Sequence, residues 1–337
     1  MTIAIRLQEV PLAQIDFPEA AGEMAASRDL DRLAASLLEV GLINPPWLKP
    51  QPGGSRFGVV TGTRRLQAAA ALGWREITAR LAPAGTPDLY CLLVHLMDNA
   101  FTRGFNLREQ ADLAVRLLGH SDAGTVAARY LPCLGLPPSQ AFLSRLIKMA
   151  GLEAPWPQLA ASGRLSLSAA ARLADWDPAS RAAAWPFWES LRLSQSKQEE
   201  LLDQVAILAR REGVSPAAVL ARDALRRALA DPDRTPQEKT EAVRRHLYAQ
   251  VYPRLSAARE AFETALARLG WKRSPRLRLH PPAVFEGPDY QLEIKFRDAP
   301  ELQQLLAEIA RLAQAEGFED LTSIPPLPDL RNPAPGL

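Results

Sequence analysis

The sequence has few of the residues that build disulfide frameworks and metal centres. Only two of its 337 residues are cysteine and only four are histidine. Cys91 and Cys133 form no CxxC pair and no disulfide framework, so we expect a cytoplasmic protein. The histidines are scattered, which predicts surface or packing roles for them and leaves no nuclease active site evident. They are His95, His120, His246 and His280.

Long apolar runs are also missing. No stretch of about 18 apolar residues occurs, and the first residues lack the apolar core of a signal peptide, so we expect neither a membrane protein nor a secreted one. The sequence contains no GxxxxGK[ST] motif, and a bound nucleotide would therefore not sit in a Walker-type phosphate loop. Hydrophobic residues make up 47% and charged residues 23%, which is typical of a folded chain with two or three domains.

The pattern of apolar residues predicts a multidomain α+β protein. Residues 1–105 mix short alternating runs with amphipathic helices, which is typical of a mixed α/β domain. Residues 106–231 are almost wholly helical, and the proline-rich segment that follows is typical of a linker. The strands expected in the first domain are 3–7, 46–49, 57–61 and 77–81, and its helices are 28–40, one that follows Gly62, and 89–99 with Thr86 as N-cap.

Residues 237–330 are expected to form a small C-terminal domain. A long helix over 237–269 comes first, and a helix at 299–316 comes last. Between them, the strand-like runs 276–280 and 290–297 predict a β-hairpin. A two-stranded piece is marginal alone, so it should pack on the helices or pair with a second copy. This domain is therefore a candidate for self-association.

The stretch from Val59 to Gly73 has the pattern of a strand, a glycine turn and a helix. A β-branched run ends at Gly62, Arg64 and Arg65 follow, and the rest is rich in alanine. The N-terminus of a helix carries partial positive charge, so this turn and the two arginines are a candidate phosphate site. The stretch alone leaves a second interpretation open, in which the glycine only turns the chain and the arginines are solvated.

Residues 125–150 have the spacing of a helix-turn-helix. A first helix over Val126–Leu131 is followed by an apolar turn and a second helix near Pro138–Met149. No acidic residue occurs in 123–152, and short polar and basic side chains are what a recognition helix uses on bases and phosphates. The candidate DNA contacts are Thr125, Arg129, Ser139, Gln140, Ser144, Arg145 and Lys148. An ordinary helical hairpin with a solvated face is the alternative.

Asp98 and Asn99 form a third candidate feature. They come at the end of an expected helix, shortly before Arg103 and an expected capping box of Asn106 and Glu109. Carboxylate and amide oxygens beside a bound phosphate could hold Mg²⁺. Taken by themselves, the two side chains fit a solvated helix end better.

The order of these features resembles the ParB family of chromosome and plasmid partition proteins, over residues 5–180. The family typically shows a Q-P-φ-x-V segment, a G-E-R-R-x-x-A-A motif and an E-N-x-Q-R…N-P-x-E-x-A motif. The second motif is matched best, by Gly62, Arg64, Arg65, Ala68 and Ala69, with Thr63 in place of the glutamate. The third is represented by Asp98, Asn99, Asn106, Glu109 and Ala111, and the first by Asn44, Pro45, Pro46 and Leu48.

The resemblance implies a ParB/sulfiredoxin-like N-terminal domain that binds CTP and Mg²⁺, followed by an all-α helix-turn-helix domain that reads a palindromic site on double-stranded DNA. It also implies a homodimeric, nucleotide-gated DNA clamp in chromosome or plasmid partition, associated with the nucleoid. A ParA-type ATPase partner and slow CTP hydrolysis are left open. The implied nucleotide contacts are Pro45, Pro46, Gly62, Thr63, Arg64, Arg65, Asn99 and Arg103, and the residues near the metal are Asp98 and Asn99.

Departures from the family pattern keep two other functions open. Thr63 and Phe101 stand where the family has a glutamate and a glutamine. The chain could therefore be a DNA-binding transcriptional regulator that has the fold without the nucleotide switch, or a nuclease or NTPase of a mobile element. Sulfiredoxin shares the N-terminal fold, but its chemistry needs a cysteine beside the glycine–arginine motif, where this chain has Thr61 and Thr63.

Overall fold

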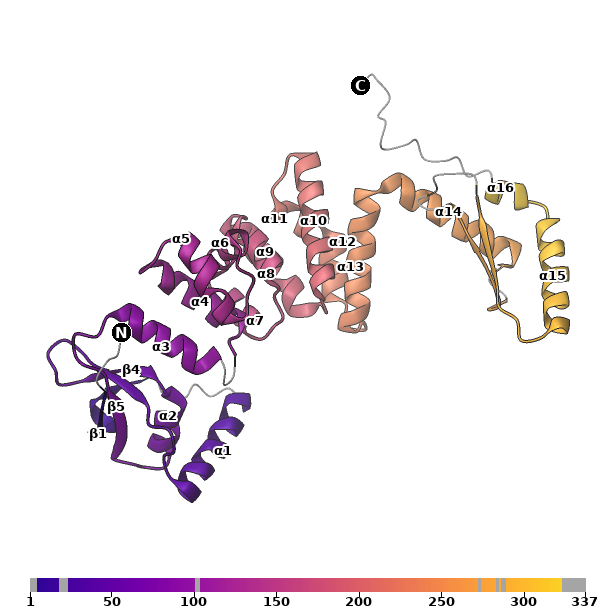
Figure 1. The fold of residues 1–337 in the computed structure, drawn as a ribbon. Coiled ribbons are helices and arrows are strands. Elements are labelled where there is room, and N and C mark those ends of the chain that lie inside the picture. Colours follow the sequence, from indigo (N-terminus) through magenta and orange to yellow (C-terminus); the bar gives the residue numbers. More distant parts are fainter. Residues whose placement is uncertain are drawn as a thin grey trace. The chain divides into compact units, whose positions relative to one another are not determined.

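The chain folds into two compact units, residues 1–175 and 176–337 (Figure 1). The computed structural model describes residues 5–17, 24–100, 104–271, 274–282, 285 and 289–322. The finer division expected from the sequence, into 1–105, 106–231 and 237–330, stays a prediction. In the part of the chain that the structure describes, no helix is long and apolar enough to cross a membrane.

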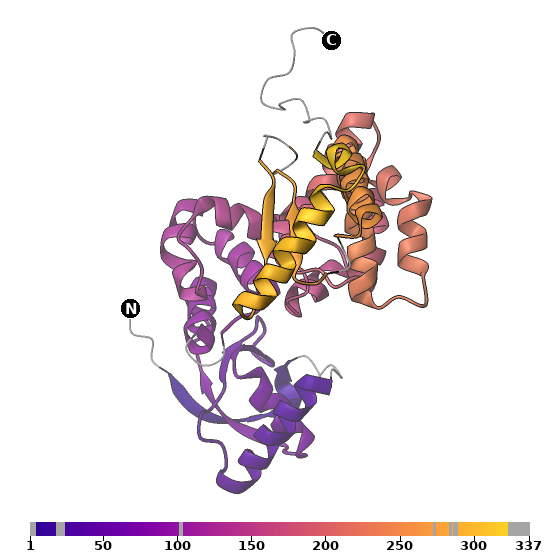
Figure 2. The same cartoon turned by 90° about the vertical axis from the view of Figure 1, so that its right-hand side faces the viewer.

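A five-stranded mixed sheet forms the centre of the N-terminal part (Figure 1, Figure 2). Its strands are β1 (Arg6–Pro11), β2 (Ile15–Asp16), β3 (Trp47–Pro50), β4 (Phe57–Thr61) and β5 (Glu76–Leu81). Their order is β1-β5-β3-β4-β2, with β1–β5 and β3–β4 antiparallel and the other two pairs parallel. Strands are present at all four expected places. Residues 3 and 4 of the first expected strand lie outside the described residues, and β1 extends beyond its expected end at residue 7 to Pro11. The short strand β2 was not expected from the sequence.

Buried and more exposed residues alternate along the strands, and the buried ones form the hydrophobic core of this part. On β5, Ile77 and Ala79 are buried while their neighbours are more exposed, and Leu48 of β3 joins the same cluster. Burial of an isoleucine or leucine side chain contributes roughly 1.5–3 kcal/mol, so this cluster holds the strands in register. The helices of this part are α1 (Met24–Val40), α2 (Thr63–Ala71) and α3 (Asp88–Ala100).

The turn from β4 into α2 requires glycine at position 62. Its φ of 98° lies in the left-handed region, which costs about 1–2 kcal/mol for other residues. There is also no room for a side chain, because a Cβ at Gly62 would lie 2.8 Å from the Cβ of Pro46. The proline segment before β3 therefore packs directly on this turn.

The rest of the first unit is helical. Its elements are α4 (Leu107–Leu118), α5 (Ala123–Thr125), the π-helical turn η2 (Val126–Tyr130), the 3-10 turn η3 (Pro132–Leu134), α6 (Gln140–Ala150), α7 (Trp156–Ala161) and α8 (Leu167–Ala174). The expected capping box is confirmed, because Asn106 Oδ1 accepts from the backbone N–H of Glu109 at 2.9 Å and the backbone N–H of Asn106 donates to Glu109 Oε2 at 3.0 Å. The first helix of the expected helix-turn-helix, Val126–Leu131, is instead mostly the π-helical turn η2.

The second unit is helical up to residue 269 and ends in a small α/β part (Figure 1). Its helices are α9 (Pro178–Ser190), α10 (Gln195–Glu212), α11 (Pro216–Leu220), α12 (Asp223–Ala230), α13 (Pro236–Val251), α14 (Pro253–Leu269), α15 (Ala299–Ala313) and α16 (Phe318–Thr322). The expected hairpin is present as antiparallel β6 (Leu277–His280) and β7 (Gln291–Ile294), and Leu277 belongs to the core of this part with Phe262 and Leu305.

Two local expectations from the sequence are wrong. The single helix expected over 237–269 is two helices, α13 and α14, because Pro253 cannot donate an N–H and its ring disfavours helical geometry in the residue before it. Thr86 does not cap α3 with its side chain. The helix begins at Asp88, and the buried Thr86 hydroxyl has no hydrogen-bond partner within the described part of the chain.

The packing of Pro46 on Gly62 can be tested with two alanine variants. Gly73 also has a positive φ, of 75°, but a Cβ there meets nothing within 4 Å. We expect Gly73→Ala to carry only the backbone cost of about 1–2 kcal/mol, and Gly62→Ala to add the cost of an overlap, about 1–3 kcal/mol more. Thermal unfolding of both variants checks this, and equal shifts of the melting temperature would contradict the close contact.

Candidate functional site

A cavity of about 320 Å³ lies beside the turn from β4 into α2. It is lined by Leu33 of α1, by the turn and start of α2, and by the last two turns of α3. The residues from the turn and from α3 are Thr61, Gly62, Thr63, Arg64, Arg65, His95, Asp98 and Asn99. The Gly62–Arg65 turn and the pair Asp98 and Asn99, which are far apart in the chain, therefore meet at one cavity.

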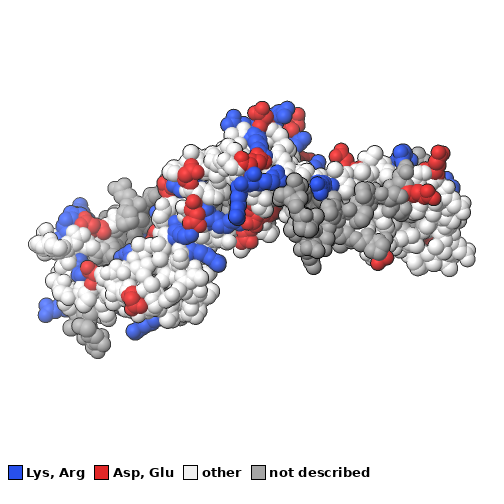
Figure 3. Space-filling view, turned by 90° about the horizontal axis from the view of Figure 1, so that it is seen from above, with Lys and Arg blue, Asp and Glu red and all other residues white. Residues whose placement is uncertain are grey.

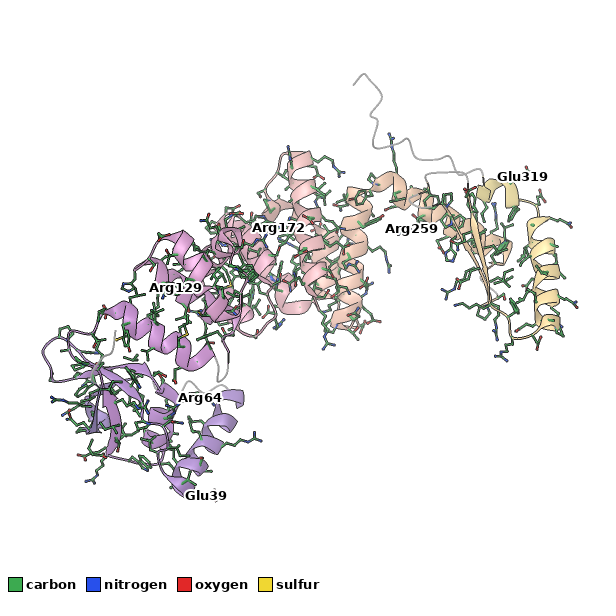
Figure 4. The ribbon with its side chains drawn as sticks, viewed as in Figure 1. Glu39, Arg64, Arg129, Arg172, Arg259 and Glu319 are labelled. Atoms are coloured by element: carbon green, nitrogen blue, oxygen red, sulfur yellow. The ribbon has the colours of Figure 1, made fainter. Side chains whose placement is uncertain are left out.

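The α2 side of this cavity is electropositive. The N-cap residue of α2 is Gly62, which has no side chain that could cap the helix, and the partial positive charge at a helix start adds to the guanidinium groups of Arg64 and Arg65. Arg64 is exposed and Arg65 is half-buried, with its Nη1 3.6 Å from the position of a Cβ at Gly62. Figure 4 shows Arg64 at the start of α2. This side could bind phosphate oxygens by charge-assisted hydrogen bonds.

The α3 side of the cavity is tied to the end of β4. The buried Thr61 hydroxyl donates a hydrogen bond to Asp98 Oδ2, which orients the carboxylate. The amide nitrogen of Asn99 donates to the backbone oxygen of His95 at 2.8 Å. The His95 ring is held in turn by a 2.9 Å hydrogen bond between Nδ1 and the backbone oxygen of Val60.

Most of the residues expected in a nucleotide site meet at this cavity. Gly62, Thr63, Arg64, Arg65, Asp98 and Asn99 line it. Pro46 is buried and packs on Gly62, whereas Pro45 is half-buried, and neither proline lines the cavity. Arg103 lies outside the described residues, as does Phe101.

Sequence reasoning missed three lining residues: Leu33, Thr61 and His95. His95 was expected to be a surface or packing residue. Helical spacing could have identified it, because it precedes Asp98 and Asn99 by one turn and so shares their helix face. No local signal could have identified Leu33, which comes from a helix that is distant in sequence.

The second candidate site is the exposed face of α6. Leu143, Leu146 and Met149 are buried at helical spacing, and this leaves the candidate DNA contacts of the helix on the opposite face. The exposed ones are Gln140, Ser144, Arg145 and Lys148. The helix is preceded by a turn in which Gly135 has a φ of 74°. Figure 3 shows basic side chains on the helical middle of the chain, with acidic ones between them.

Several of these polar side chains already have partners within the fold. The Ser139 hydroxyl accepts from the backbone N–H of Phe142 at 3.3 Å, and so caps α6. The Thr125 hydroxyl donates to Asp122 Oδ2 at 2.6 Å, and this bond together with the Thr125 backbone N–H holds the pKa of Asp122 below its usual range. A contact of either hydroxyl with DNA would therefore compete with a bond that it makes within the fold. For Ser139 this bond is the cap of α6, and for Thr125 it is the bond to Asp122.

Two of the three charged candidates, Lys148 and Arg129, differ in their surroundings. Lys148 Nζ lies 2.6 Å from Asp175 Oδ1, with both side chains largely exposed. The guanidinium of Arg129, labelled in Figure 4, lies 5.7 Å from the ring centre of the buried Tyr130. An exposed ion pair of this kind contributes only about 0–1 kcal/mol, so Lys148 can exchange Asp175 for a phosphate at little cost.

The described residues hold no group of three or more His, Cys, Asp or Glu side chains that could bind a metal ion. The side-chain oxygens at the cavity are those of the Asp98 carboxylate, the Asn99 amide, and the Thr61 and Thr63 hydroxyls, and Asp98 brings the one carboxylate among the lining residues. Mg²⁺ is commonly bound by one or two carboxylates together with the phosphates of a substrate. This donor set therefore fits Mg²⁺ that enters with a triphosphate, rather than Mg²⁺ held by the protein alone.

Comparison with known proteins gives one sequence match and several weak structural ones. Residues 3–100 match the model of the ParB N-terminal domain, whereas no curated protein matches the chain. C-terminally truncated ParB from Caulobacter crescentus, complexed to the centromeric parS site, is 20% identical and has a TM-score of 0.35; the match covers 58% of this chain and 99% of that one.

Two further structures are similar at the same level. C-terminally truncated Caulobacter crescentus ParB complexed with CTP-γ-S is 21% identical over 50% of this chain and 92% of that one, with a TM-score of 0.24. A Pnob8-like ParB-N domain is 14% identical over 68% of this chain and 98% of that one, with a TM-score of 0.34. These scores are too low to carry a functional argument. The sequence match, together with the five-stranded sheet and its helices, shows that residues 3–100 of this chain are a ParB N-terminal domain.

Proposed function

We propose that this chain is a ParB-like, site-specific DNA-binding protein whose N-terminal domain binds CTP and gates a DNA clamp. The observation that carries the proposal is the cavity at which the Gly62–Arg65 turn meets Asp98 and Asn99, inside a ParB N-terminal domain. The same proposal includes a role in chromosome or plasmid partition, a homodimer and a ParA-type ATPase partner. It takes these from the resemblance of the sequence to the ParB family.

In this proposal the α2 side of the cavity binds the triphosphate. Arg64 and Arg65 supply charge-assisted donors, and the start of α2 adds its partial positive charge. Gly62 lets the backbone pass close to the ligand, as glycine does in other phosphate-binding turns. The volume of about 320 Å³ is at the lower end of the range for small-molecule sites, about 300–1,000 Å³.

Asp98 and Asn99 would hold the metal ion on the α3 side. The hydrogen bond from Thr61 fixes one carboxylate oxygen of Asp98, which keeps the group turned toward the end of β4. Mg²⁺ would supply positive charge that offsets the negative charge of the triphosphate near this carboxylate. Without such a cation, Asp98 would repel the ligand that the arginines attract.

The helix-turn-helix supplies the DNA contacts of the proposal. Arg145 and Gln140 have the side chains that pair with guanine and adenine edges in the major groove, and Arg129 and Lys148 offer charge for phosphates. Their positions on the exposed face of α6 and at the end of η2 support these roles. Capping by Ser139 fixes the start of α6, which is the end that a recognition helix presents to the bases.

α3 offers a physical route from the nucleotide to the DNA. This helix carries Asp98 and His95 at the cavity, and it also contacts η3 and α4 of the helix-turn-helix part. A ligand that pulls on the last turns of α3 would therefore move the elements that support α6. Coupling of this kind needs a difference in ligand affinity between two arrangements of α3.

A second function has one specific observation in its favour. Thr63, which lines the cavity, stands where the family motif has a glutamate, so the α2 side lacks that carboxylate. This difference would fit a pocket that binds a nucleotide without hydrolysing it. It would also fit a DNA-binding regulator that uses no nucleotide. Equal DNA footprints with and without nucleotide would favour the regulator.

Removal of Arg64 tests the phosphate-binding side. We expect Arg64→Ala to weaken binding of CTP with Mg²⁺ by at least about tenfold in calorimetric titrations, because a charge-assisted contact is lost. Arg75→Ala is the matched control, since Arg75 is an exposed arginine of the same domain that does not line the cavity. Absence of heat with the unchanged protein, with and without DNA, would sink the nucleotide proposal.

Removal of Arg145 tests the recognition helix. A DNA site is first enriched from a random library with the unchanged protein. We then expect Arg145→Ala to lose about 1–3 kcal/mol of affinity for that site at fixed salt, and to lose selectivity at one base pair. Arg210→Ala removes the same charge from α10 in the second unit and should change affinity little. Unchanged binding by Arg145→Ala would show that the DNA-reading face is elsewhere.

A further inference from the structure

His95 is a cavity residue to which the proposed function gives no contact with the ligand. It lies on α3 one turn before Asp98, and it lines the same cavity as Arg64 and Arg65. Its side chain is half-buried. A polar ring in the wall of a ligand cavity must find a partner there, either water or the ligand itself.

The end of β4 determines which ring nitrogen of His95 carries the proton. Nδ1 lies 2.9 Å from the backbone oxygen of Val60. A carbonyl oxygen can only accept a hydrogen bond, so Nδ1 is the donor. In the neutral ring, the other nitrogen, Nε2, then carries the lone pair and is an acceptor. The ring of Phe105, tilted by 41° at 6.3 Å between centres, packs beside it.

Nε2 has no hydrogen-bond partner among the described residues. The contacts of His95 are the bond from Nδ1 to Val60, the bond from Asn99 to the His95 backbone oxygen at 2.8 Å, and the ring contact with Phe105. Arg64 and Arg65 on the α2 side of the cavity are hydrogen-bond donors, whereas Nε2 of His95, which lines the α3 side, is an acceptor.

A phosphate group cannot satisfy this acceptor, because the oxygens of a nucleoside triphosphate carry almost no donor protons at neutral pH. The nucleoside part offers the required chemistry, since sugar hydroxyls and the amino group of cytosine are donors. We propose that His95 Nε2 accepts a hydrogen bond from a hydroxyl or amino group of the bound nucleoside and so helps to determine which nucleotide binds. This inference rests on the proposed function of the cavity.

His95→Asn separates a ligand contact from a structural role. The amide nitrogen of asparagine reaches about the position of Nδ1, so the bond to Val60 is kept while Nε2 is removed. Unchanged protein and variant are titrated calorimetrically with CTP, 2′-deoxy-CTP, 3′-deoxy-CTP and UTP, at about pH 8, where imidazole is ordinarily neutral. His120→Asn is the matched control, because His120 is exposed and outside the cavity.

Each of the three analogues lacks one hydroxyl or amino group of CTP, and one of these groups is the proposed donor to His95 Nε2. We expect the unchanged protein to bind CTP about threefold to tenfold more tightly than the analogue that lacks this donor. The variant should bind CTP only as tightly as that analogue, and its affinity for the analogue itself should be unchanged. Loss of discrimination against a deoxy analogue identifies the sugar hydroxyl, and loss against UTP identifies the amino group.

Three results would overturn the inference while leaving the nucleotide pocket in place. They are equal binding of all four ligands by the unchanged protein, an equal loss of affinity for all four in the variant, and no change in the variant. If the unchanged protein binds none of the four, the pocket proposal itself has failed, and the role of His95 falls with it.

Discussion

Two hydrogen bonds between the end of β4 and the last turns of α3 hold the candidate pocket together. The Val60 carbonyl accepts from His95, and the Thr61 hydroxyl donates to Asp98. Because β4 continues directly into Gly62 and α2, the same strand end positions the arginines on the other side of the cavity. A register shift of one residue in β4 would turn both sets of groups away, since neighbouring strand residues face opposite sides.

The close contact of Pro46 with Gly62 adds a third segment to this arrangement. The residue before β3, the turn after β4 and the end of α3 come from separate stretches of the sequence, yet each restricts the position of the others. α3 extends the dependence further, because it also contacts η3 and α4, and α4 packs against α6. A ligand in the cavity and DNA on α6 would therefore act on one connected set of helices.

Charge is divided between the two walls of the cavity. The α2 wall carries Arg64, Arg65 and a helix N-terminus, and the α3 wall carries the Asp98 carboxylate with the side chains of His95 and Asn99. An anionic ligand in this cavity would be attracted by the α2 wall and would need a cation beside Asp98. Thr63 lies on the α2 wall and brings no carboxylate there, so the lining residues of this wall carry no negative side chain.

The sequence by itself determined the local features. The β-branched run before Gly62, the Asn106 capping box, the buried stripe of α6 and the C-terminal hairpin follow from periods and caps that lie within a few residues of one another. Only the tertiary structure decided which of these features meet. In the sequence, His95 is one of four scattered histidines. The pairing of β3 with β4 and the packing of α3 on β4 bring it to the same cavity as Arg64. Such contacts depend on the order of strands in the sheet and on the packing of helices. Both arise from the burial of apolar side chains over the whole core, so no single position in the sequence predicts them.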